Sequence, residues 1–202
     1  MLESPSTSRD DHFLRTERIG FRLWRAEDLP SAAGLWGDPE VTRFVGGPLS
    51  TEAVEKRLAA EIASQEAHGV QYWPLFLLAT GEHLGCCGLH PYPSPERTLE
   101  LGFHLRPAFW RRGLAREAAQ AVIRHAFTDL GADLLFAGHH PGNSASRALL
   151  ESLGFRYVRD ELYPPTGLLH PSYLLRRVDG DEPVMVDEGR HEGIPDEPGT
   201  CR

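Results

Sequence analysis

Three strand-like segments follow one another with only short turn sequences between them. They cover residues 72–79, 84–90 and 98–105, and the connections TGEH and PYPSPER carry the Gly, Pro and Ser residues typical of turns. Connections this short can join antiparallel strands, whereas parallel strands need a crossover of about a dozen residues or more. The sequence therefore predicts an antiparallel meander at the centre of the fold.

Four helices are predicted around this meander, at about residues 27–36, 51–69, 113–130 and 143–154. Ser50 or Thr51 can cap the second helix and Asn143 the fourth, while Gly69 and Gly154 stand where a left-handed residue ends a helix. Apolar residues recur at helical spacing. The faces expected to be buried carry Leu114, Ala118, Ala121 and Val122 in the third helix and Ala145, Leu149 and Leu153 in the fourth.

Further strands complete the pattern. They are expected at residues 16–24, before the first helix, and at 134–137, 155–158 and 173–178. Residues 160–171 contain three prolines and are predicted to form a long loop. The order of these elements indicates a mixed α/β fold of about seven strands and four helices.

The two ends of the chain differ in composition from its middle. Residues 1–13 are polar, and residues 179–202 combine eight acidic residues with two arginines and several Gly and Pro residues. Neither segment can bury enough apolar surface to offset the entropy lost on ordering. We therefore predict disorder at both ends and a single domain, residues 14–178, between them.

Charge and composition argue against several classes of protein. The acidic tail carries −6 of the net charge of −8, so the body is nearly neutral and lacks the basic surplus typical of nucleic-acid binding. No apolar run reaches the roughly 20 residues of a membrane span, and the start lacks the apolar core of a signal peptide. The three cysteines have no metal-type spacing. We expect a cytoplasmic protein that binds neither nucleic acid, membrane nor metal.

The segment ELGFHLRPAFWRRGLAREAA combines a strand, a proline stop and an Arg-Arg-Gly sequence at the start of an amphipathic helix. The first amides of a helix lack partners within it and the helix dipole adds partial positive charge, so residues 112–116 can bind a pyrophosphate. Gly113 lets the backbone approach the phosphates closely, and Arg111 and Arg112 add charge. By itself, this segment is equally compatible with an ordinary helix start.

A second motif follows one helix and one strand later and reads NSASRALLESLGF. Together with TERIGFRLW, DPEVTRFVGG and the Arg-Arg-Gly segment, it resembles the GNAT superfamily of N-acetyltransferases, and within it the RimJ/RimL-like branch, over residues 14–178. The resemblance implies a mostly antiparallel twisted sheet that is splayed between its fourth and fifth strands, at 98–105 and 134–138. Acetyl-CoA is expected to insert into that gap.

The resemblance also implies how acetyl-CoA is held. Its pantetheine arm is expected to pair with the backbone of Phe103, His104 and Leu105, and Asn143 corresponds to the family asparagine that faces this arm. The pyrophosphate is expected to lie over a loop made of Arg111, Arg112, Gly113, Leu114, Ala115 and Arg116. Arg111 stands where related members often have glycine. The expected partners are acetyl-CoA and an amine acceptor, and a homodimer is left open.

The reaction requires a group that removes a proton from the acceptor ammonium. In an extended segment 98–105, the apolar residues share one face and leave Glu100, Gly102 and His104 on the other. Glu100 matches the glutamate at this strand start in the family and is the first candidate base, acting through a water. Its alternatives are a surface glutamate or an anchor for the substrate ammonium. His104 is the second candidate base, with a structural histidine as its alternative.

The departing thiolate also needs a partner. Many relatives place a tyrosine seven residues after the motif asparagine, but here that position is Leu150. Ser146 matches the serine of the RimL-like branch and is predicted to hydrogen-bond to the thiolate, the alternative being an ordinary first-turn residue. Glu100 and Ser146 are thus the predicted catalytic residues.

The acceptor is expected to be a primary amine, either a protein N-terminus or, slightly favoured, a small molecule. Six side chains can line its pocket: Trp73, Tyr92, His139, His140, His170 and Tyr173. Two other functions remain open. The absent tyrosine favours a non-catalytic acyl-CoA-binding or sensing module, and a binding protein for other phosphorylated ligands is the third.

Overall fold

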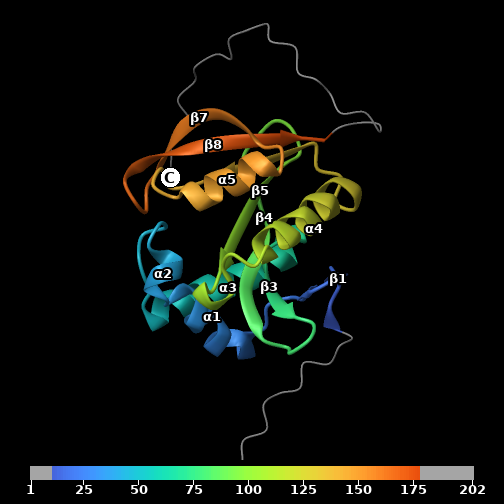
Figure 1. Ribbon diagram of the computed structural model, residues 1–202, viewed down its shortest axis with the longest axis vertical. Helices are drawn as coiled ribbons and strands as arrows, with labels where there is room; N and C mark the ends of the chain where they lie inside the picture. Colours follow the sequence, from blue (N-terminus) through green and yellow to red (C-terminus); the bar gives the residue numbers. More distant parts are fainter. Residues whose placement is uncertain (1–10, 178–202) are drawn as a thin grey trace, which may run out of the picture.

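The computed structural model describes residues 11–177, which form one eight-stranded sheet with helices on both faces (Figure 1). The strand order is β1-β2-β3-β4-β5-β6-β8-β7, and neighbours are antiparallel except for β5 and β6. The strands are β1 (Leu14–Arg15), β2 (Ile19–Phe21), β3 (Tyr72–Leu77), β4 (His83–Pro91), β5 (Thr98–Leu105), β6 (Leu134–Gly138), β7 (Arg156–Tyr163) and β8 (Leu168–Arg176). The predicted mixed, mostly antiparallel fold is confirmed.

All four predicted helices are present, with one additional short helix. The α-helices are α1 (Leu29–Trp36), α2 (Pro39–Thr42), α3 (Thr51–His68), α4 (Leu114–Thr128) and α5 (Ser144–Ser152), and two 3-10 turns are η2 (Ala26–Asp28) and η3 (Pro107–Phe109). Ser50 accepts a hydrogen bond from the Ala53 amide at the start of α3, and Gly69 ends this helix in the left-handed conformation. Both caps are as predicted from the sequence.

Two predictions about strands were wrong. The strand predicted at residues 16–24 is too long, because only Ile19–Phe21 form a strand (β2) and residues 16–18 make the turn that follows β1. Residues 160–171 are not a long loop, because β7 and β8 form a hairpin that covers most of this range. Pro171 fits within β8 since it uses its carbonyl oxygen, which accepts a hydrogen bond from the His139 amide at 3.2 Å.

Two hydrophobic clusters pack against the two faces of the sheet. The larger one contains all four residues predicted for the buried face of α4, namely Leu114, Ala118, Ala121 and Val122. The smaller one contains Trp24, Tyr72 and the buried residues of α1 and α3, among them Trp36 at the end of α1. In α5 the predicted stripe is wrong in part, because Leu150 is the buried residue and Ala145 is exposed.

The sheet opens between its two parallel strands. Pairing joins Thr98–Glu100 of β5 to Leu134–Phe136 of β6 and does not extend further along β5. Beyond this point β6 continues to pair with β8, through Ala137 and Gly138. The remainder of β5, residues 101–105, therefore has one edge without a neighbouring strand, at the place predicted for the split.

The described chain begins at Asp11, whose carboxylate pairs with Arg25 at 2.8 Å, and Phe13 donates a backbone hydrogen bond to Phe21. The disorder predicted for residues 1–13 and 179–202 lies outside the described residues except at residues 11–13, where Asp11 and Phe13 make these contacts. Within residues 11–177, no helix is long and apolar enough to cross a membrane.

Candidate active site

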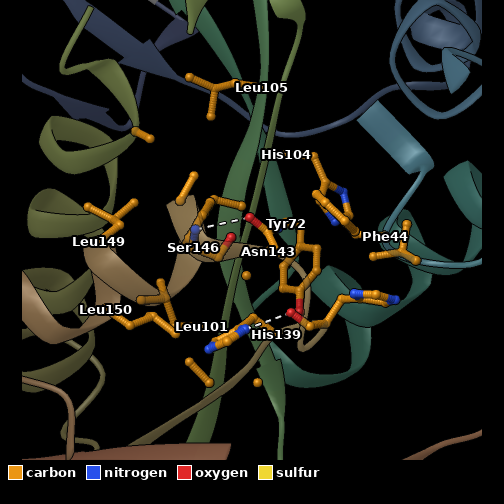
Figure 2. A pocket seen from close by; sticks show the side chains of 18 of the residues that line it. Phe44, Tyr72, Leu101, His104, Leu105, His139, Asn143, Ser146, Leu149 and Leu150 are labelled. Carbon is orange, nitrogen blue, oxygen red and sulfur yellow. Dashed lines mark hydrogen bonds between the residues drawn. The ribbon is translucent and has the colours of Figure 1, made fainter. Parts of the chain in front are cut away.

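A cavity of about 1130 Å³ lies where β5 and β6 separate. Its walls come from β5, β6, α3, the loop before α4, the start of α5 and the β7–β8 hairpin. Figure 2 shows Leu149 and Leu150 on one side, His104 and Phe44 on the other, and Tyr72 between them. Ligand pockets commonly measure about 300–1,000 Å³, so this cavity has room for a large ligand or for two substrates.

The cavity brings together nearly all the site residues that the sequence predicted. Eleven of the twelve line it: Glu100, Phe103, His104, Leu105, Arg111, Gly113, Leu114, Ala115, Arg116, Asn143 and Ser146. The twelfth, Arg112, is not part of the wall, and its guanidinium lies over the ring of Phe109, 5.6 Å from the ring centroid.

The loop before α4 has the backbone conformation of an anion site. Gly113 is the N-cap residue with a φ of 76°, and the first bond within the helix joins the Glu117 amide to the Gly113 carbonyl at 3.1 Å. The amides of residues 114–116 therefore have no acceptor inside the helix. Arg111 also has a positive φ, 58°, so the loop keeps a left-handed residue where related members often have glycine.

This loop is held by the turn between β1 and β2, a contact that sequence reasoning missed. Glu117 accepts hydrogen bonds from the Thr16 hydroxyl at 2.5 Å and from the Arg18 amide at 2.9 Å, and it pairs with the Arg18 guanidinium at 2.6 Å. Arg18 also donates to the Arg112 carbonyl at 3.0 Å. Because these residues lie about 100 positions apart, no local pattern could have connected them.

The free edge of β5 presents alternate backbone groups to the cavity. The Arg106 amide donates a hydrogen bond to the Leu84 carbonyl on β4. Because backbone groups alternate in direction along an antiparallel strand, the amide and carbonyl of His104 also face β4, whereas those of Phe103 and Leu105 face the gap. The Leu105 carbonyl accepts a hydrogen bond from the Trp110 indole at 2.7 Å. Phe103 and Leu105 are thus the residues whose backbone can meet a ligand arm.

Glu100 lies on the face of β5 opposite to the larger hydrophobic cluster, as predicted. The register between β4 and β5 is regular, so no bulge changes the alternation. Burial raises the pKa of the Glu100 carboxyl, while nearby His90 and a hydrogen bond from Tyr72 act in the other direction. A raised pKa brings a carboxylate closer to the pH at which a general base works best.

His104 shares this face and lines the cavity at the edge of the smaller hydrophobic cluster, where it contacts Trp36 and Cys86. Its Nδ1 accepts a hydrogen bond from the Trp36 indole at 3.3 Å. Burial lowers the pKa of His104 to about 3, so the side chain is neutral at physiological pH and is a weak base. The geometry therefore favours the structural alternative for His104 over the catalytic one.

This depressed pKa predicts a loss of stability in acid. Below about pH 6.5 the unfolded chain protonates His104, whereas the folded chain resists protonation down to about pH 3. The free energy of unfolding should therefore fall as pH decreases from 6.5, by up to about 1.4 kcal/mol per pH unit for this group. Urea unfolding midpoints between pH 7 and pH 4.5 should fall less steeply for His104→Asn than for the wild type. If the midpoints of the two proteins fall equally steeply with decreasing pH, His104 is not the source of the acid-induced loss of stability.

Asn143 and Ser146 are linked by a helix cap. The Asn143 side chain accepts a hydrogen bond from the Ser146 amide at 3.1 Å, which fixes the start of α5 beside the cavity (Figure 2). Leu150 is fully buried one turn further along and supplies no hydroxyl group. Ser144 and Ser146 are the hydroxyl side chains of α5 that line the cavity.

Four of the six side chains suggested for the acceptor pocket line the cavity, namely Tyr92, His139, His140 and His170. Trp73 does not, since it is buried in the larger cluster and its indole donates a hydrogen bond to Gln65. Tyr173 does not line the cavity either, although its hydroxyl is in hydrogen-bond contact with His139. Among residues 11–177, no group of three or more His, Cys, Asp or Glu side chains is arranged to hold a metal ion.

Several further cavity residues escaped the sequence analysis, among them Glu61, Tyr72 and His90. His90 lies directly opposite Glu100 in the β4–β5 register. The meander predicted from the sequence could have suggested this neighbour. Glu61 comes from α3 and had no such signal.

Comparison with known proteins agrees with this geometry. Residues 18–156 match the model of the acetyltransferase (GNAT) domain family. The uncharacterized N-acetyltransferase p20 of Bacillus licheniformis is 30% identical over 146 residues, which cover 71% of this chain and 82% of p20. FsC-acetyl coenzyme A-N(2)-transacetylase of Aspergillus fumigatus is 34% identical over 131 residues, which cover 60% of this chain and 55% of that protein.

A solved structure shows the same fold. RimL, the ribosomal L7/L12 alpha-N-protein acetyltransferase, superposes with a TM-score of 0.70 over 80% of this chain and 92% of RimL, at 15% identity. The split strand, the anion-type loop and the match to the family model over most of the chain lead to one assignment. The chain belongs to the GNAT family of acetyltransferases and is an N-acetyltransferase.

Proposed function

We propose that the protein transfers the acetyl group of acetyl-CoA to a primary amine by direct attack of the amine on the thioester. The observation that carries this proposal is the cavity at the β5–β6 split, which joins a phosphate-type loop, a free strand edge and the half-buried carboxylate of Glu100. Acetyl-CoA supplies the acetyl thioester when it is bound. The protein contributes binding, orientation and proton transfer.

The residues of the cavity fit acetyl-CoA. The open amides of 114–116 and the side chains of Arg111 and Arg116 suit a pyrophosphate, because they combine backbone donors with positive charge. The backbone of Phe103 and Leu105 can pair with the amide groups of the pantetheine arm. His104 lies between these two positions, and Asn143 faces the gap from α5.

The chemistry requires removal of a proton from the acceptor ammonium and stabilisation of the departing thiolate. Glu100 is the base in this proposal, acting through a water, and the hydroxyl of Ser146 donates a hydrogen bond to the thiolate. An acetylated cysteine is not required. Cys86 and Cys87 are both buried, and burial raises the pKa of each thiol, that of Cys86 to about 12, so neither offers a reactive thiolate.

A small amine fits the acceptor side better than a polypeptide terminus. The segment after α2 reaches across the cavity, where Phe44 packs against His140 with their ring centroids 5.0 Å apart. Gly46 in the same segment adjoins Pro165 at the tip of the β7–β8 hairpin. These contacts roof the acceptor end, so an extended peptide would have to displace them.

The rival function is a non-catalytic module that binds acyl-CoA, and one observation favours it. Leu150 is buried at the position where many relatives carry the tyrosine that protonates the thiolate. Both functions require acetyl-CoA binding, so only turnover separates them. A free thiol has a pKa of about 8.5, which makes an ionised leaving group tolerable near neutral pH without that tyrosine.

Acetyl-CoA should stabilise the protein against heat. A ligand present at about 100 times its dissociation constant adds about 2.7 kcal/mol, which corresponds to a rise in Tm of roughly 5–10 °C for a chain of this size. Differential scanning fluorimetry with acetyl-CoA, CoA and ATP measures this. The first two should raise Tm and ATP should not. If none of the three ligands changes Tm, the loop of residues 111–116 is an ordinary helix start and not a pyrophosphate site.

A further inference from the structure

A carboxylate–imidazole pair, in which the carboxylate is buried and the imidazole is partly exposed, lies in the cavity wall beside Glu100. Glu61 of α3 is 2% exposed, and its Oε2 accepts hydrogen bonds from His90 Nε2 and from the Tyr72 amide, both at 2.8 Å. The imidazole of His90 also stacks on the Tyr72 ring, with centroids 4.1 Å apart and an interplanar angle of 11°. A hydrogen bond and a stacked ring together fix the orientation of His90.

This orientation determines which nitrogen of His90 is free. A carboxylate only accepts hydrogen bonds, so Nε2 carries the hydrogen and the lone pair of the neutral ring is on Nδ1. Among the described residues Nδ1 has no hydrogen-bond partner, and this atom is not fully buried. Because 32% of the His90 side chain is exposed, Nδ1 can reach water.

His90 and Glu100 are direct cross-strand neighbours in the β4–β5 ladder. Side chains in such positions share one face of the sheet, with Cβ atoms about 5 Å apart. The half-buried carboxylate of Glu100 is thus next to an imidazole that reaches solvent. Glu100 lines the same cavity, and Tyr72 and His90 are among the neighbours that act against the burial-induced rise of its pKa.

Other charged and titratable groups surround this pair on every neighbouring element. They are Glu61 and Arg57 from α3, Tyr72 from β3, Glu100 from β5, Tyr92 from the segment that follows β4, and Glu161 from β7. Arg57 lies over the Trp36 ring, and its Nε is 3.9 Å from Glu61. The carboxylate of Glu61 is the partner in direct contact with His90, and it offsets positive charge on the imidazole.

We propose that His90 carries the proton from the acceptor site to solvent and that Glu61 is its positioning residue. This inference rests on the proposed acetyl transfer to an amine. An N–H bond of the acceptor ammonium breaks and an O–H bond forms on Glu100. That proton then moves to Nδ1 of His90, which gives an imidazolium held by Glu61, and finally to water. Glu100 returns to its ionised state for the next acceptor.

The test replaces His90 and asks whether a free imidazole can do its work. At pH 7, His90→Gln should lower kcat by about 10²-fold, while the KM for acetyl-CoA stays unchanged. His90→Gly should show a similar loss, and imidazole added to the buffer should restore its turnover in a concentration-dependent manner. His125→Gln is the matched control, because His125 forms the same kind of pair with Asp129, at 2.6 Å, outside the cavity.

A readout without turnover tests the role of Glu61. Nitrogen NMR shifts of His90 should report the Nε2–H tautomer in the wild type and a mixture of tautomers in Glu61→Gln. Unchanged kcat in His90→Gln, or a loss that imidazole does not restore, would overturn the inference while acetyl transfer stands. Wild-type protein that binds acetyl-CoA but acetylates no amine would instead contradict the proposed function, and this inference would fail with it.

Discussion

Glu100→Gln should lower kcat at pH 7 by about 10²- to 10⁴-fold, the range that a positioned general base contributes. The side chain stays nearly the same size, and burial beside Tyr72 remains, so the change removes proton acceptance with little change in packing. The loss should shrink as the pH is raised toward the pKa of the amine, because the acceptor then arrives already neutral. Steady-state assays of CoA release from pH 6 to pH 10 measure both effects.

A matched control separates the role of Glu100 from a general effect of removing a carboxylate. Glu96 is exposed at the end of the same hairpin and pairs with Arg176 at 3.3 Å, outside the cavity. Glu96→Gln should keep the wild-type kcat at every pH. If Glu100→Gln also keeps it, Glu100 is a surface or anchoring glutamate, and the base must be sought elsewhere in the cavity.

Gly113→Val should raise the dissociation constant for acetyl-CoA by about 10²-fold or more. Hydrogen bonds to charged groups are worth about 1.5–3 kcal/mol each, and a branched side chain at the mouth of α4 would displace the pyrophosphate from at least one or two amides. The variant should also lose about 1–3 kcal/mol of stability, because Gly113 has a φ of 76°.

Gly69→Val provides the comparison that separates strain from binding. Gly69 has nearly the same backbone conformation, with a φ of 72°, and a Cβ at this position would have open space around it. Both variants should therefore lose similar stability, measured by urea unfolding. Only Gly113→Val should weaken acetyl-CoA in calorimetric titration. Equal effects of the two variants on acetyl-CoA binding, or no effect of Gly113→Val, would show that the pyrophosphate does not bind to this loop.

Local sequence was sufficient for the parts of the fold that local interactions determine. The caps at Ser50 and Gly69 gave the bounds of α3 to within a residue, and strict alternation in 98–105 placed Glu100 on the face away from the core. The β7–β8 hairpin was missed because prolines normally indicate a loop. Only the pairing of the whole sheet shows that Pro171 can stay in a strand through its carbonyl group.

The candidate site also contains some features that local sequence determines and others that only tertiary packing determines. The residues of the 111–116 loop and of β5 come from two adjacent segments, so a motif could identify them together. The Arg18–Glu117 clamp and the Glu61–His90 pair join segments that only tertiary packing brings into contact. Sequence reasoning also treated His104 as a possible base, since no local pattern shows that its Nδ1 accepts a hydrogen bond from Trp36.

The most direct test of the central claim is transfer of a labelled acetyl group. The purified protein is incubated with acetyl-CoA labelled in the acetyl carbon, together with a panel of small primary amines and of peptides with free N-termini. We expect label in an N-acetylated amine, with one CoA thiol released for each product and the best rates among the small amines. Tight binding of acetyl-CoA without transfer to any amine would contradict this and identify a binding module instead.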